Sequence, residues 1–584
     1  MRRTKIVGTL GPATDDVEIL KNLIRSGLDA ARVNFSHGTY ESHSVLINKL
    51  KQAREELNAP IPLILDTKGP EIRIKKFGCE KIYLERGDKF TLTTEDVEGD
   101  KTQVSVTYLN LPSDLSKGSR VLIDDGLIEL RVENIEGNNI HCVVENGGFL
   151  SSNKGINVPD VFVDLPSLTQ RDIEDIKFGV EMGFDYVAAS FIRSGNDIIN
   201  IRRVLEENGG NDIYIIAKIE SREGVNNIDE ILEVADGIMV ARGDLGVEIP
   251  PEEVPLVQKM LIKKANDMGK PVITATQMLE SMVNNPRPTR AEANDVANAI
   301  FDGSDAIMLS GETAKGDYPV EAVAMMAKIA QRTESSINYG HNLAEQFQSG
   351  QTNITNAISY AACATAAELK TSCICSVTKS GFTARMISRF RPCCPIVACT
   401  VDAMVWRQLN LVWGCKAMFH DSPVKNEEVF DLAMKKAVES NIAKNGDTVV
   451  MAIGVPVGVS GSTNTLRVDI VGDVICKGIG IGNKKISGKA RIIKVLNEAE
   501  RKFKKGDILV TPSTSNELIP YIKKASAIIV GPVDHPENCH AEIVGRALDI
   551  PVILCNTKVV DFIPNDTLIT VDAKKGFVYA GIPE

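Results

Sequence analysis

Short apolar runs alternate with amphipathic stretches of helical period along the first part of the chain. Eight runs have the length and the apolar body of a buried strand: Thr4 to Leu10, Ala31 to Phe35, Ile61 to Asp66, Tyr186 to Phe191, Ile213 to Ile219, Gly237 to Ala241, Pro271 to Ala275 and Ala306 to Leu309. Eight stretches have the helical period: Asp15 to Ser26, Tyr40 to Leu57, Leu168 to Met182, Asn196 to Glu207, Asn227 to Ala235, Glu253 to Met268, Thr289 to Asp302 and Pro319 to Ser336. Eight strand-helix units predict a closed (β/α)8 parallel barrel, the TIM barrel, with an active site at the carboxyl ends of its strands.

The third strand-helix unit is interrupted by a stretch of different character. Short alternating runs are separated there by turn sequences such as Asp124-Asp125-Gly126 and Glu136-Gly137-Asn138-Asn139. This pattern predicts a small antiparallel β-barrel domain at residues 70–165, inserted between barrel parts 1–69 and 166–344. Because the insertion leaves and re-enters at the carboxyl rim, we expect a lid that closes over the site, with Gly69-Pro70 and Leu165-Pro166 as hinges.

Beyond the barrel, a polar connector at Glu345 to Asn353 leads into a second alternating region. The pattern predicts helices at Ile354 to Leu369, Thr383 to Phe390, Ala403 to Leu409 and Asn426 to Ser440, and strands at Ser372 to Val377, Pro395 to Cys399, Thr448 to Ile453 and Arg467 to Val471. We expect an open α/β domain at residues 345–474. From Cys476 the composition shifts to Gly and Lys, which predicts a linker through Lys485 into a last βα-type domain within residues 475–584.

Composition and charge indicate a globular protein and argue against several classes of partner. With 584 residues, of which 43% are hydrophobic and 24% charged, the chain is an ordinary globular protein that is too long for one hydrophobic core. Its net charge of -11 argues against nucleic acid or an anionic membrane as the main partner, while local basic sites for small phosphates are compatible with it. The sequence has no apolar run near the length of a membrane span and no signal-peptide core, so we expect a cytoplasmic protein.

The ends of the fifth and sixth predicted strands carry the clearest chemistry. Lys218 and Glu220 lie two residues apart, so strand alternation directs both side chains the same way. After the sixth strand, Gly243 permits close backbone approach and Asp244 supplies a second carboxylate. A lysine and two carboxylates on one rim suggest a magnesium ion that holds an anionic substrate. The alternative is that Lys218 and Glu220 form only a structural ion pair.

Polar residues also follow four other predicted strands. They are Arg32, Asn34 and Ser36; Asp66, Thr67 and Arg73; Thr276 and Gln277; and Ser310, Glu312 and Thr313. The strand bodies are apolar, and a barrel with a purely structural role would not need polar groups at so many strand ends. We therefore interpret this rim as a functional site.

Five segments at this rim resemble the signatures of the pyruvate kinase family, in the family's order. They are Arg32 to Gly38, Asp66 to Arg73, Met239 to Pro250, Ala275 to Leu279 and Leu309 to Ala314. The resemblance covers about residues 1 to 474. It implies the barrel, lid and α/β architecture, a homotetramer, and an Mg2+- and K+-dependent glycolytic enzyme that transfers the phosphoryl group of phosphoenolpyruvate to ADP, giving pyruvate and ATP.

The resemblance also implies a role for each rim residue. Lys218 would contact the phosphoryl group during its transfer, when an ammonium offsets the negative charge on the equatorial oxygens. Arg32 would bind the phosphate of phosphoenolpyruvate through its planar fork. The further assignments are Glu220 and Asp244 to Mg2+ (or Mn2+), Gly243, Asp244 and Thr276 to the substrate carboxylate, and Asn34, Ser36, Asp66 and Thr67 to K+.

The nucleotide would meet residues of both the barrel and the lid. The resemblance assigns Asn34, His37, Arg73 and Lys154 to this role. Lys154 belongs to the lid, so closure would bring charge to the site as well as exclude water. Glu71 has the form that goes with potassium dependence in the family, because a lysine there would supply the positive charge internally.

Phosphoryl transfer leaves an enolate that must be protonated at carbon to give pyruvate. We hypothesise that Thr276, or a water chain near Ser310 and Glu312, supplies this proton. Two other functions stay open: a metal-dependent lyase or aldolase on a similar barrel, which would need neither the monovalent-cation set nor Lys154, and a non-catalytic binding protein that kept the fold.

A second site is predicted where the strand at Ser372 to Val377 runs into a helix. Thr378, Lys379, Ser380, Gly381 and Thr383 place hydroxyls, a lysine and a glycine before the helix N-terminus, which is typical of an anion site and equally of a helix-capping turn. In the family the corresponding loop binds the phosphate of an allosteric effector, and Gly458 to Thr465 resembles the loop that closes over it. We expect a phosphorylated sugar or nucleotide as activator.

The last domain resembles the swivelling phosphohistidine domain of phosphoenolpyruvate-using enzymes. The segment that carries this likeness is Cys539-His540-Ala541-Glu542 and the helix that follows. The match is partial, because Asn538-Cys539 stand where a Thr-Ser pair is usual. We therefore favour a structural or regulatory domain over phosphotransfer through His540.

Overall fold

A computed structural model describes residues 1–339, 343, 353–423, 425–456, 461, 463–472, 474–495, 503–533 and 535–581 of the chain. The predicted connector from Glu345 up to residue 352, and residues 458–460 and 462 of the predicted closing loop, lie outside the described residues. The chain divides into two compact units, of which the first comprises residues 1–364, 376–426 and 452–465 and the second residues 365–375, 427–451 and 466–584.

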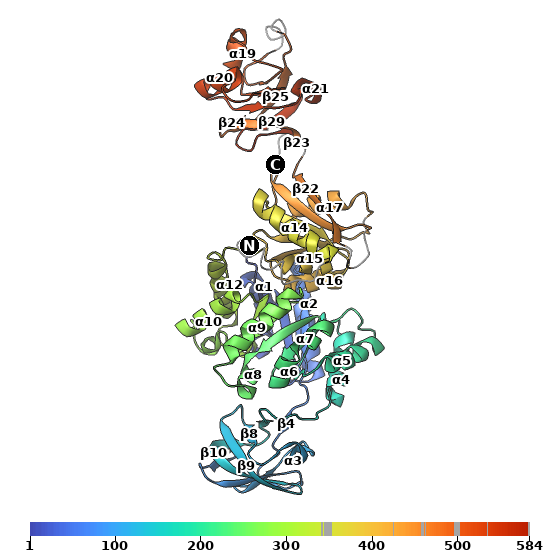
Figure 1. Cartoon of the computed structure of the whole chain (residues 1–584), viewed down its shortest axis with the longest axis vertical. Helices are drawn as coiled ribbons and strands as arrows, with labels where there is room; N and C mark the ends of the chain where they lie inside the picture. Colours follow the sequence, from blue (N-terminus) through green and yellow to red (C-terminus); the bar gives the residue numbers. More distant parts are fainter. Residues whose placement is uncertain are drawn as a thin grey trace. The chain divides into compact units, whose positions relative to one another are not determined.

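The first unit is built around a closed barrel of parallel strands, as predicted (Figure 1). Its order is β1-β17-β16-β15-β14-β13-β3-β2, and the strands are β1 (Lys5–Thr9), β2 (Ala30–Asn34), β3 (Leu63–Asp66), β13 (Tyr186–Ala189), β14 (Tyr214–Ile219), β15 (Gly237–Ala241), β16 (Val272–Ala275) and β17 (Ala306–Leu309). β3 pairs with β13 although the whole lid separates them in the sequence. The carboxyl ends of these strands therefore meet at one rim.

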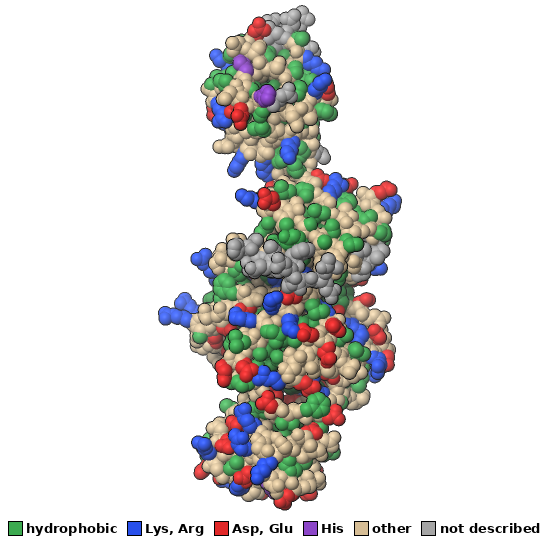
Figure 2. All heavy atoms as spheres, viewed as in Figure 1, with side chains coloured by type: hydrophobic (Ala, Val, Ile, Leu, Met, Phe, Trp, Pro, Cys, Tyr) green, Lys and Arg blue, Asp and Glu red, His purple; other side chains and the backbone are tan. Residues whose placement is uncertain are grey.

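Helices surround the barrel, and polar side chains fix where several of them begin. The long helices are α1 (Val17–Ser26), α2 (Tyr40–Glu56), α4 (Gln170–Glu181), α5 (Gly195–Glu207), α7 (Ile228–Val234), α9 (Val254–Asp267), α10 (Arg290–Phe301) and α12 (Pro319–Glu334). Asp16 caps α1, and threonines 39, 169 and 289 form capping boxes that satisfy the first backbone N–H groups of α2, α4 and α10. Basic and acidic side chains lie interspersed over this part of the surface in Figure 2.

Strand alternation separates two apolar layers of the barrel. On β14, Ile215, Ala217 and Ile219 belong to the core between strands and helices, whereas Ile216 belongs to the core inside the barrel. Lys218 takes the next inward position of the same strand, and it is buried. The fold therefore directs Lys218 to the inside of the rim.

The inserted lid is a β domain with its own apolar core. One sheet has the order β4-β12-β8-β9-β10-β6-β7 and a second pairs β11 with β5. The strands are β4 (Ile72–Arg73), β5 (Lys81–Leu84), β6 (Lys89–Thr93), β7 (Gln103–Ser105), β8 (Arg120–Ile123), β9 (Ile128–Glu136), β10 (Asn139–Asn146), β11 (Gly148–Ser151) and β12 (Gly155–Asn157), with the short helix α3 (Leu111–Asp114). Its first strand β4 pairs with its last strand β12, so the lid begins and ends at one place.

The α/β region after the barrel contains one strand that the sequence pattern did not predict. Its sheet has the order β20-β19-β18-β21-β22, and β20 (Cys415–Phe419) is the missed strand. Lys416 interrupts the apolar pattern there, which is why the run is inconspicuous. The other elements are α14 (Ile354–Leu369), β18 (Cys373–Val377), α15 (Phe382–Ser388), β19 (Ile396–Thr400), α16 (Ala403–Gln408), α17 (Val429–Glu439), β21 (Thr448–Gly454) and β22 (Thr463–Ile470).

The Gly- and Lys-rich stretch after Cys476 is not a linker, which corrects the prediction. It forms β23 (Val474–Lys477), β24 (Ile479–Ile481) and the start of β25 (Lys485–Ile492) in a sheet of order β23-β30-β29-β25-β26-β27-β28-β24. The remaining elements are β26 (Ile508–Thr511), α19 (Ile519–Ile522), β27 (Ala527–Val530), α20 (His540–Leu548), β28 (Val552–Leu554), α21 (Val559–Phe562), β29 (Leu568–Asp572) and β30 (Phe577–Ala580). A Cβ on Gly480 would lie 1.8 Å from the Ala573 carbonyl oxygen, so glycine marks close backbone approach here rather than flexibility.

Within the described parts of both units, no helix is long and apolar enough to cross a membrane.

Candidate active site

A cavity of about 590 Å³ opens at the carboxyl rim of the barrel. Ten of the residues that the sequence singled out line it: Arg32, Asn34, Ser36, His37, Asp66, Glu71, Arg73, Lys218, Glu220 and Asp244. They come from strand ends β2, β3, β14 and β15 and from the lid strand β4. The barrel therefore brings most of the predicted set into one volume.

Lys218 and Arg32 meet at the carboxylate of Asp66. The Lys218 ammonium donates to Asp66 Oδ1 over 3.1 Å, and Arg32 Nε donates to Asp66 Oδ2. Arg32 also donates from a second nitrogen to Thr9 Oγ1 over 2.9 Å. All three charged groups are at least nine-tenths buried. Two cations thus share the Asp66 carboxylate, and Lys218 also pairs with the Glu220 carboxylate over 3.0 Å.

The charges in this cluster shift one another's ionisation. Burial alone would raise the pKa of the Asp66 carboxyl, but Arg32 and Lys218 hold it below its ordinary value. Burial would likewise lower the pKa of the Lys218 ammonium, but the charges of Asp66 and Glu220 raise it. Both residues are therefore charged at neutral pH, and the ammonium keeps its full charge for an anionic ligand.

Glu220 and Asp244 have the chemistry of a divalent-cation site. Both carboxylates line the cavity. Burial raises the pKa of each against the opposing charge of Lys218, and the charge of Asp244 raises the pKa of Glu220 further. A buried carboxylate (Glu220) and a half-buried one (Asp244) that repel each other would be stabilised by a hard cation such as Mg2+, whose other ligands would come from water and substrate. Among the described residues, no group of three or more His, Cys, Asp or Glu is placed to hold a metal ion.

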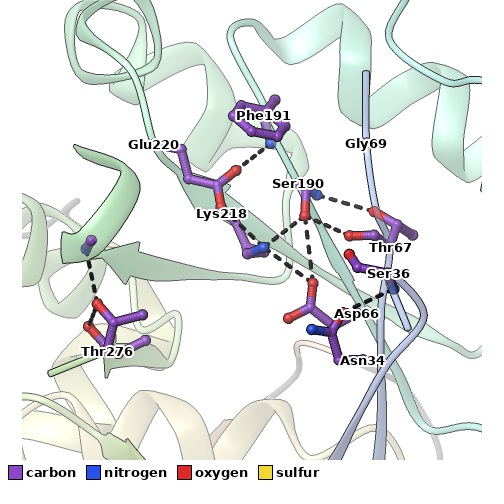
Figure 3. Close-up of polar contacts among 12 residues, drawn as sticks. Asn34, Ser36, Asp66, Thr67, Gly69, Ser190, Phe191, Lys218, Glu220 and Thr276 are labelled. Carbon is purple, nitrogen blue, oxygen red and sulfur yellow. Dashed lines mark hydrogen bonds and ion pairs between the residues drawn. The ribbon is translucent and has the colours of Figure 1, made fainter. Parts of the chain in front are cut away.

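The residues predicted to bind potassium lie at or beside the same cavity, and some of their oxygens already accept hydrogen bonds from the protein. Asn34 Oδ1 accepts a hydrogen bond from the Ser36 N–H over 3.0 Å, and both residues line the cavity. Thr67 is buried, and its hydroxyl accepts from the Ser190 N–H over 3.1 Å (Figure 3). These oxygens fit a large monovalent cation by their type.

Thr276 and Gly243 lie at a neighbouring cavity of about 840 Å³, which Asp244 also lines. The Gly243 N–H donates to Thr276 Oγ1 over 2.9 Å, and the Thr276 hydroxyl donates to the Ala275 carbonyl oxygen over 2.6 Å. Thr276 has a φ of 69°, a conformation that is unusual for a threonine. Its hydroxyl is thus held in place beside this second cavity.

The predicted lid residues differ in where they point. Arg73 lines the main cavity, pairs with Glu71 over 2.6 Å and donates to the Asn153 carbonyl oxygen over 2.6 Å. Lys154 instead pairs with Asp124 of the lid over 2.8 Å and is not among the residues that line this cavity. The structure therefore brings Arg73 to the site but not Lys154.

Three residues that hold the site together were not predicted. Ser190 and Phe191 follow β13, whose end the sequence analysis treated as part of the strand. The Phe191 N–H donates to Glu220 Oε2 over 2.5 Å, from a backbone with a φ of 55°. Arg242 donates to the Thr276 carbonyl oxygen over 2.6 Å and pairs with Asp295 over 2.7 Å. A search for polar residues after the end of β13, as was made for the other strands, would have found Ser190. The unusual backbone of Phe191 leaves no signal in the sequence.

The predicted effector loop precedes α15. Gly381 caps this helix with a φ of 74°, and Thr378 and Thr383 are buried. Thr383 Oγ1 lies 2.6 Å from Thr463 Oγ1, whereas Lys379 is exposed. The loop thus joins β18 to α15 with its lysine free to reach solvent.

In the second unit, His540 is the first residue of α20. Its Nδ1 lies 3.0 Å from Thr514 Oγ1 and its Nε2 3.0 Å from Asn516 Oδ1. Both ring nitrogens therefore have a hydrogen-bond partner.

Comparisons with known proteins agree with this arrangement. Residues 1–323 match the family described as pyruvate kinase, barrel domain, residues 356–469 match pyruvate kinase, alpha/beta domain, and residues 503–576 match PEP-utilising enzyme, mobile domain. The chain is 48% identical to a pyruvate kinase of Geobacillus stearothermophilus over 582 residues, covering 99% of both chains. It is 48% identical to a pyruvate kinase of Bacillus licheniformis and 45% identical to one of Staphylococcus saprophyticus, each over 583 residues and 99% of the relative.

Proposed function

Because the chain belongs to the pyruvate kinase family of phosphotransferases, we propose that it transfers the phosphoryl group of phosphoenolpyruvate to ADP, with Mg2+ and K+ as cofactors. The observation that carries this proposal is the convergence of Arg32, Lys218, Glu220 and Asp244 on one cavity. A guanidinium, an ammonium and two carboxylates in one place suit a phosphate ester and a divalent cation.

The proposed roles follow from the contacts of each side chain. Lys218, kept charged by Asp66, would stabilise negative charge on the phosphoryl oxygens during transfer. Arg32 would bind the phosphate of phosphoenolpyruvate, and its bond to Asp66 fixes the guanidinium in advance. Mg2+ held by Glu220 and Asp244 would supply further positive charge against the phosphoryl group and the enolate oxygen.

The substrate carboxylate and the nucleotide would bind to different groups of residues. Gly243, Asp244 and Thr276 are proposed for the carboxylate, and Asn34, His37 and Arg73 for the nucleotide phosphates. Lys154 pairs with Asp124 of the lid, so it would have to leave Asp124 to contact the nucleotide phosphates. The monovalent cation would be held by Asn34, Ser36, Asp66 and Thr67.

We also propose regulation by a phosphorylated sugar or nucleotide at residues 378–383. Buried hydroxyls beside a glycine-capped helix start support a phosphate site there. Assembly as a homotetramer, Mn2+ as a substitute for Mg2+, and a glycolytic role in the cytoplasm follow from the family alone. For the last domain we propose a structural or regulatory role rather than phosphotransfer, because both nitrogens of His540 are engaged.

A coupled assay for pyruvate tests the main proposal. Wild-type protein is assayed with phosphoenolpyruvate and ADP, with each metal omitted in turn, and omission of either metal is expected to reduce the rate strongly. Lys218→Met should lower kcat by about 10³-fold or more, because it removes the charge facing the phosphoryl group. Lys263→Met, at an exposed position of α9, is the matched control and should retain the wild-type rate. No ATP formation with both metals present would overturn the proposal, and product formation without ADP would favour a lyase.

A further inference from the structure

Ser190 lies at the centre of the polar network in Figure 3 although the proposed chemistry does not use it. It follows β13 directly and is 4% exposed. Its Oγ lies 2.6 Å from the Thr67 carbonyl oxygen, 2.6 Å from Lys218 Nζ and 3.4 Å from Asp66 Oδ1. Its own N–H donates to Thr67 Oγ1 over 3.1 Å. One small side chain thus contacts both the predicted potassium set and the proposed catalytic lysine.

The single proton of the Ser190 hydroxyl decides the direction of these bonds. A hydroxyl donates once and accepts through two lone pairs. The Thr67 carbonyl oxygen can only accept and is the nearer acceptor, so the proton points to Thr67. The lone pairs are then left to accept from the ammonium of Lys218. Ser190 therefore transmits the position of the Thr67 backbone to Lys218.

The ammonium of Lys218 has three acceptors for its three protons. They are Asp66 Oδ1 at 3.1 Å, Glu220 Oε1 at 3.0 Å and Ser190 Oγ at 2.6 Å. Asp66 is shared with Arg32, and Glu220 is a proposed metal ligand. Ser190 is the closest of the three and the only one of them that carries no charge of its own. It therefore keeps the ammonium in place when a carboxylate turns to another cation.

We propose that Ser190 is a positioning residue that fixes Lys218 against the Asp66-Thr67 segment and so couples occupancy of the monovalent-cation set to the placement of the catalytic ammonium. This inference rests on the proposed function for the identity of the substrate. The hydrogen bonds of Ser190 that support the inference do not depend on which substrate the protein binds. Phosphoryl transfer is sensitive to the placement of such a charge, because stabilisation falls off as the charge leaves the equatorial oxygens.

Two variants at this position and one elsewhere separate positioning from structural support. Ser190→Ala removes the hydroxyl, and Ser190→Thr retains it. Ser304→Ala is the matched control, since Ser304 is also buried in the barrel and its Oγ lies 2.7 Å from Thr274 Oγ1, at the start of β17 rather than at the rim. If Ser190→Ala does not fold, Ser190→Cys takes its place, because a thiol fills the same space but hydrogen-bonds weakly.

The first readout needs neither metal nor activity. Metal-free protein is labelled with an amine-reactive reagent, and the extent of labelling at Lys218 is followed by mass spectrometry as pH is raised. Ser190→Ala should label Lys218 several-fold faster than wild type, whereas Ser190→Thr and Ser304→Ala should not. Equal labelling in Ser190→Ala and wild type would overturn the inference even if the enzyme proves to be a pyruvate kinase.

The second readout is kinetic. Ser190→Ala should lower kcat by about 10- to 100-fold, leave KM for phosphoenolpyruvate within about twofold, and raise the K+ concentration for half-maximal activity. Ser190→Thr should recover most of the kcat. A loss confined to thermal stability, equal to that of Ser304→Ala, would assign Ser190 to structure alone. Absence of activity in the wild type would instead count against the proposed function, while the labelling result would still decide the role of Ser190.

Discussion

The hydroxyl of Tyr214 donates a hydrogen bond to the carbonyl oxygen of Ser380 over 3.0 Å. Arg385 donates to both of these oxygens over 3.1 Å and stacks on the Tyr214 ring. Tyr214 is the first residue of β14, the strand that carries Lys218 near its other end. The proposed effector loop and the proposed active site are therefore joined by one strand.

Tyr214→Phe is expected to weaken activation while leaving the basal rate unchanged. The variant removes the hydrogen bond from the Tyr214 hydroxyl to the Ser380 carbonyl oxygen and the one that Arg385 donates to this hydroxyl. Such a bond contributes about 1 kcal/mol, so the activation factor should fall by several-fold. Fructose 1,6-bisphosphate, ribose 5-phosphate and AMP are the probes, and initial rates at low phosphoenolpyruvate are the measurement. Tyr186→Phe is the control, because its hydroxyl contacts the Gln408 carbonyl oxygen and not the loop. Unchanged activation in Tyr214→Phe would exclude this route.

Arg32→Lys should reduce affinity for phosphoenolpyruvate more than a conservative change normally does. Arg32 donates to both Asp66 and Thr9 while facing the cavity, and a single ammonium cannot reproduce this geometry. KM for phosphoenolpyruvate is expected to rise by about 10- to 100-fold. Arg25→Lys, at an exposed position of α1, should leave KM unchanged. A wild-type KM in Arg32→Lys would remove Arg32 from phosphate binding.

Mg2+ binding should release a proton at mildly acid pH. Burial and the charge of Asp244 raise the pKa of Glu220 to about 7 against the attraction of Lys218, so the metal-free folded protein holds a proton that the unfolded chain has lost. Stability from this group is therefore present at low pH and is lost as pH rises through about 7. Calorimetric titration with Mg2+ in two buffers of different ionisation enthalpy should give about one proton released at pH 6 and almost none at pH 8. Glu220→Gln should abolish the release, and equal release at both pH values would contradict the assignment.

Thr276→Ala should separate phosphoryl transfer from enolate protonation, if Thr276 supplies the proton. The hydroxyl is held by Gly243 and Ala275 at the edge of the site. We expect solvent hydrogen exchange into pyruvate to slow far more than substrate binding weakens. Measurement of deuterium incorporation by NMR checks this outcome. Unchanged exchange would transfer the role to the region of Ser310 and Glu312.

His540→Asn should leave phosphoryl transfer to ADP within about twofold of wild type, because both ring nitrogens of His540 are engaged by Thr514 and Asn516. Incubation with phosphoenolpyruvate labelled with ³²P should leave no acid-labile label on the wild-type protein. His535→Asn, on an exposed position, is the control. Label that is present in the wild type and lost only in His540→Asn would establish a phosphohistidine.

The barrel was predictable from the sequence, but the hydrogen bonds and ion pairs within its site were only partly predictable. Alternation and period suffice for β14 and for the inward direction of Lys218, because burial on one side of a strand forces a period of two. Phe191 shows the limit: its left-handed backbone, which aims an N–H at Glu220, results from tertiary packing and has no local signature. The segment around Gly480 was wrongly predicted to be a linker, because a glycine can mark either a flexible segment or a place where two backbones approach closely.

The pairing of β4 with β12 also bears on how the barrel assembles. β3 and β13 must meet across residues 67–185, and closing so long a loop is costly in chain entropy. When the lid collapses around its own core, Ile72 comes to lie opposite Ile156, and only residues 67–71 and 158–185 remain to be closed, the latter including helix α4. This shortening lowers the closure cost by about 1 kcal/mol. The inserted domain is therefore expected to fold before β3 and β13 pair. By bringing these two strands closer together, it should speed refolding of the barrel that it interrupts.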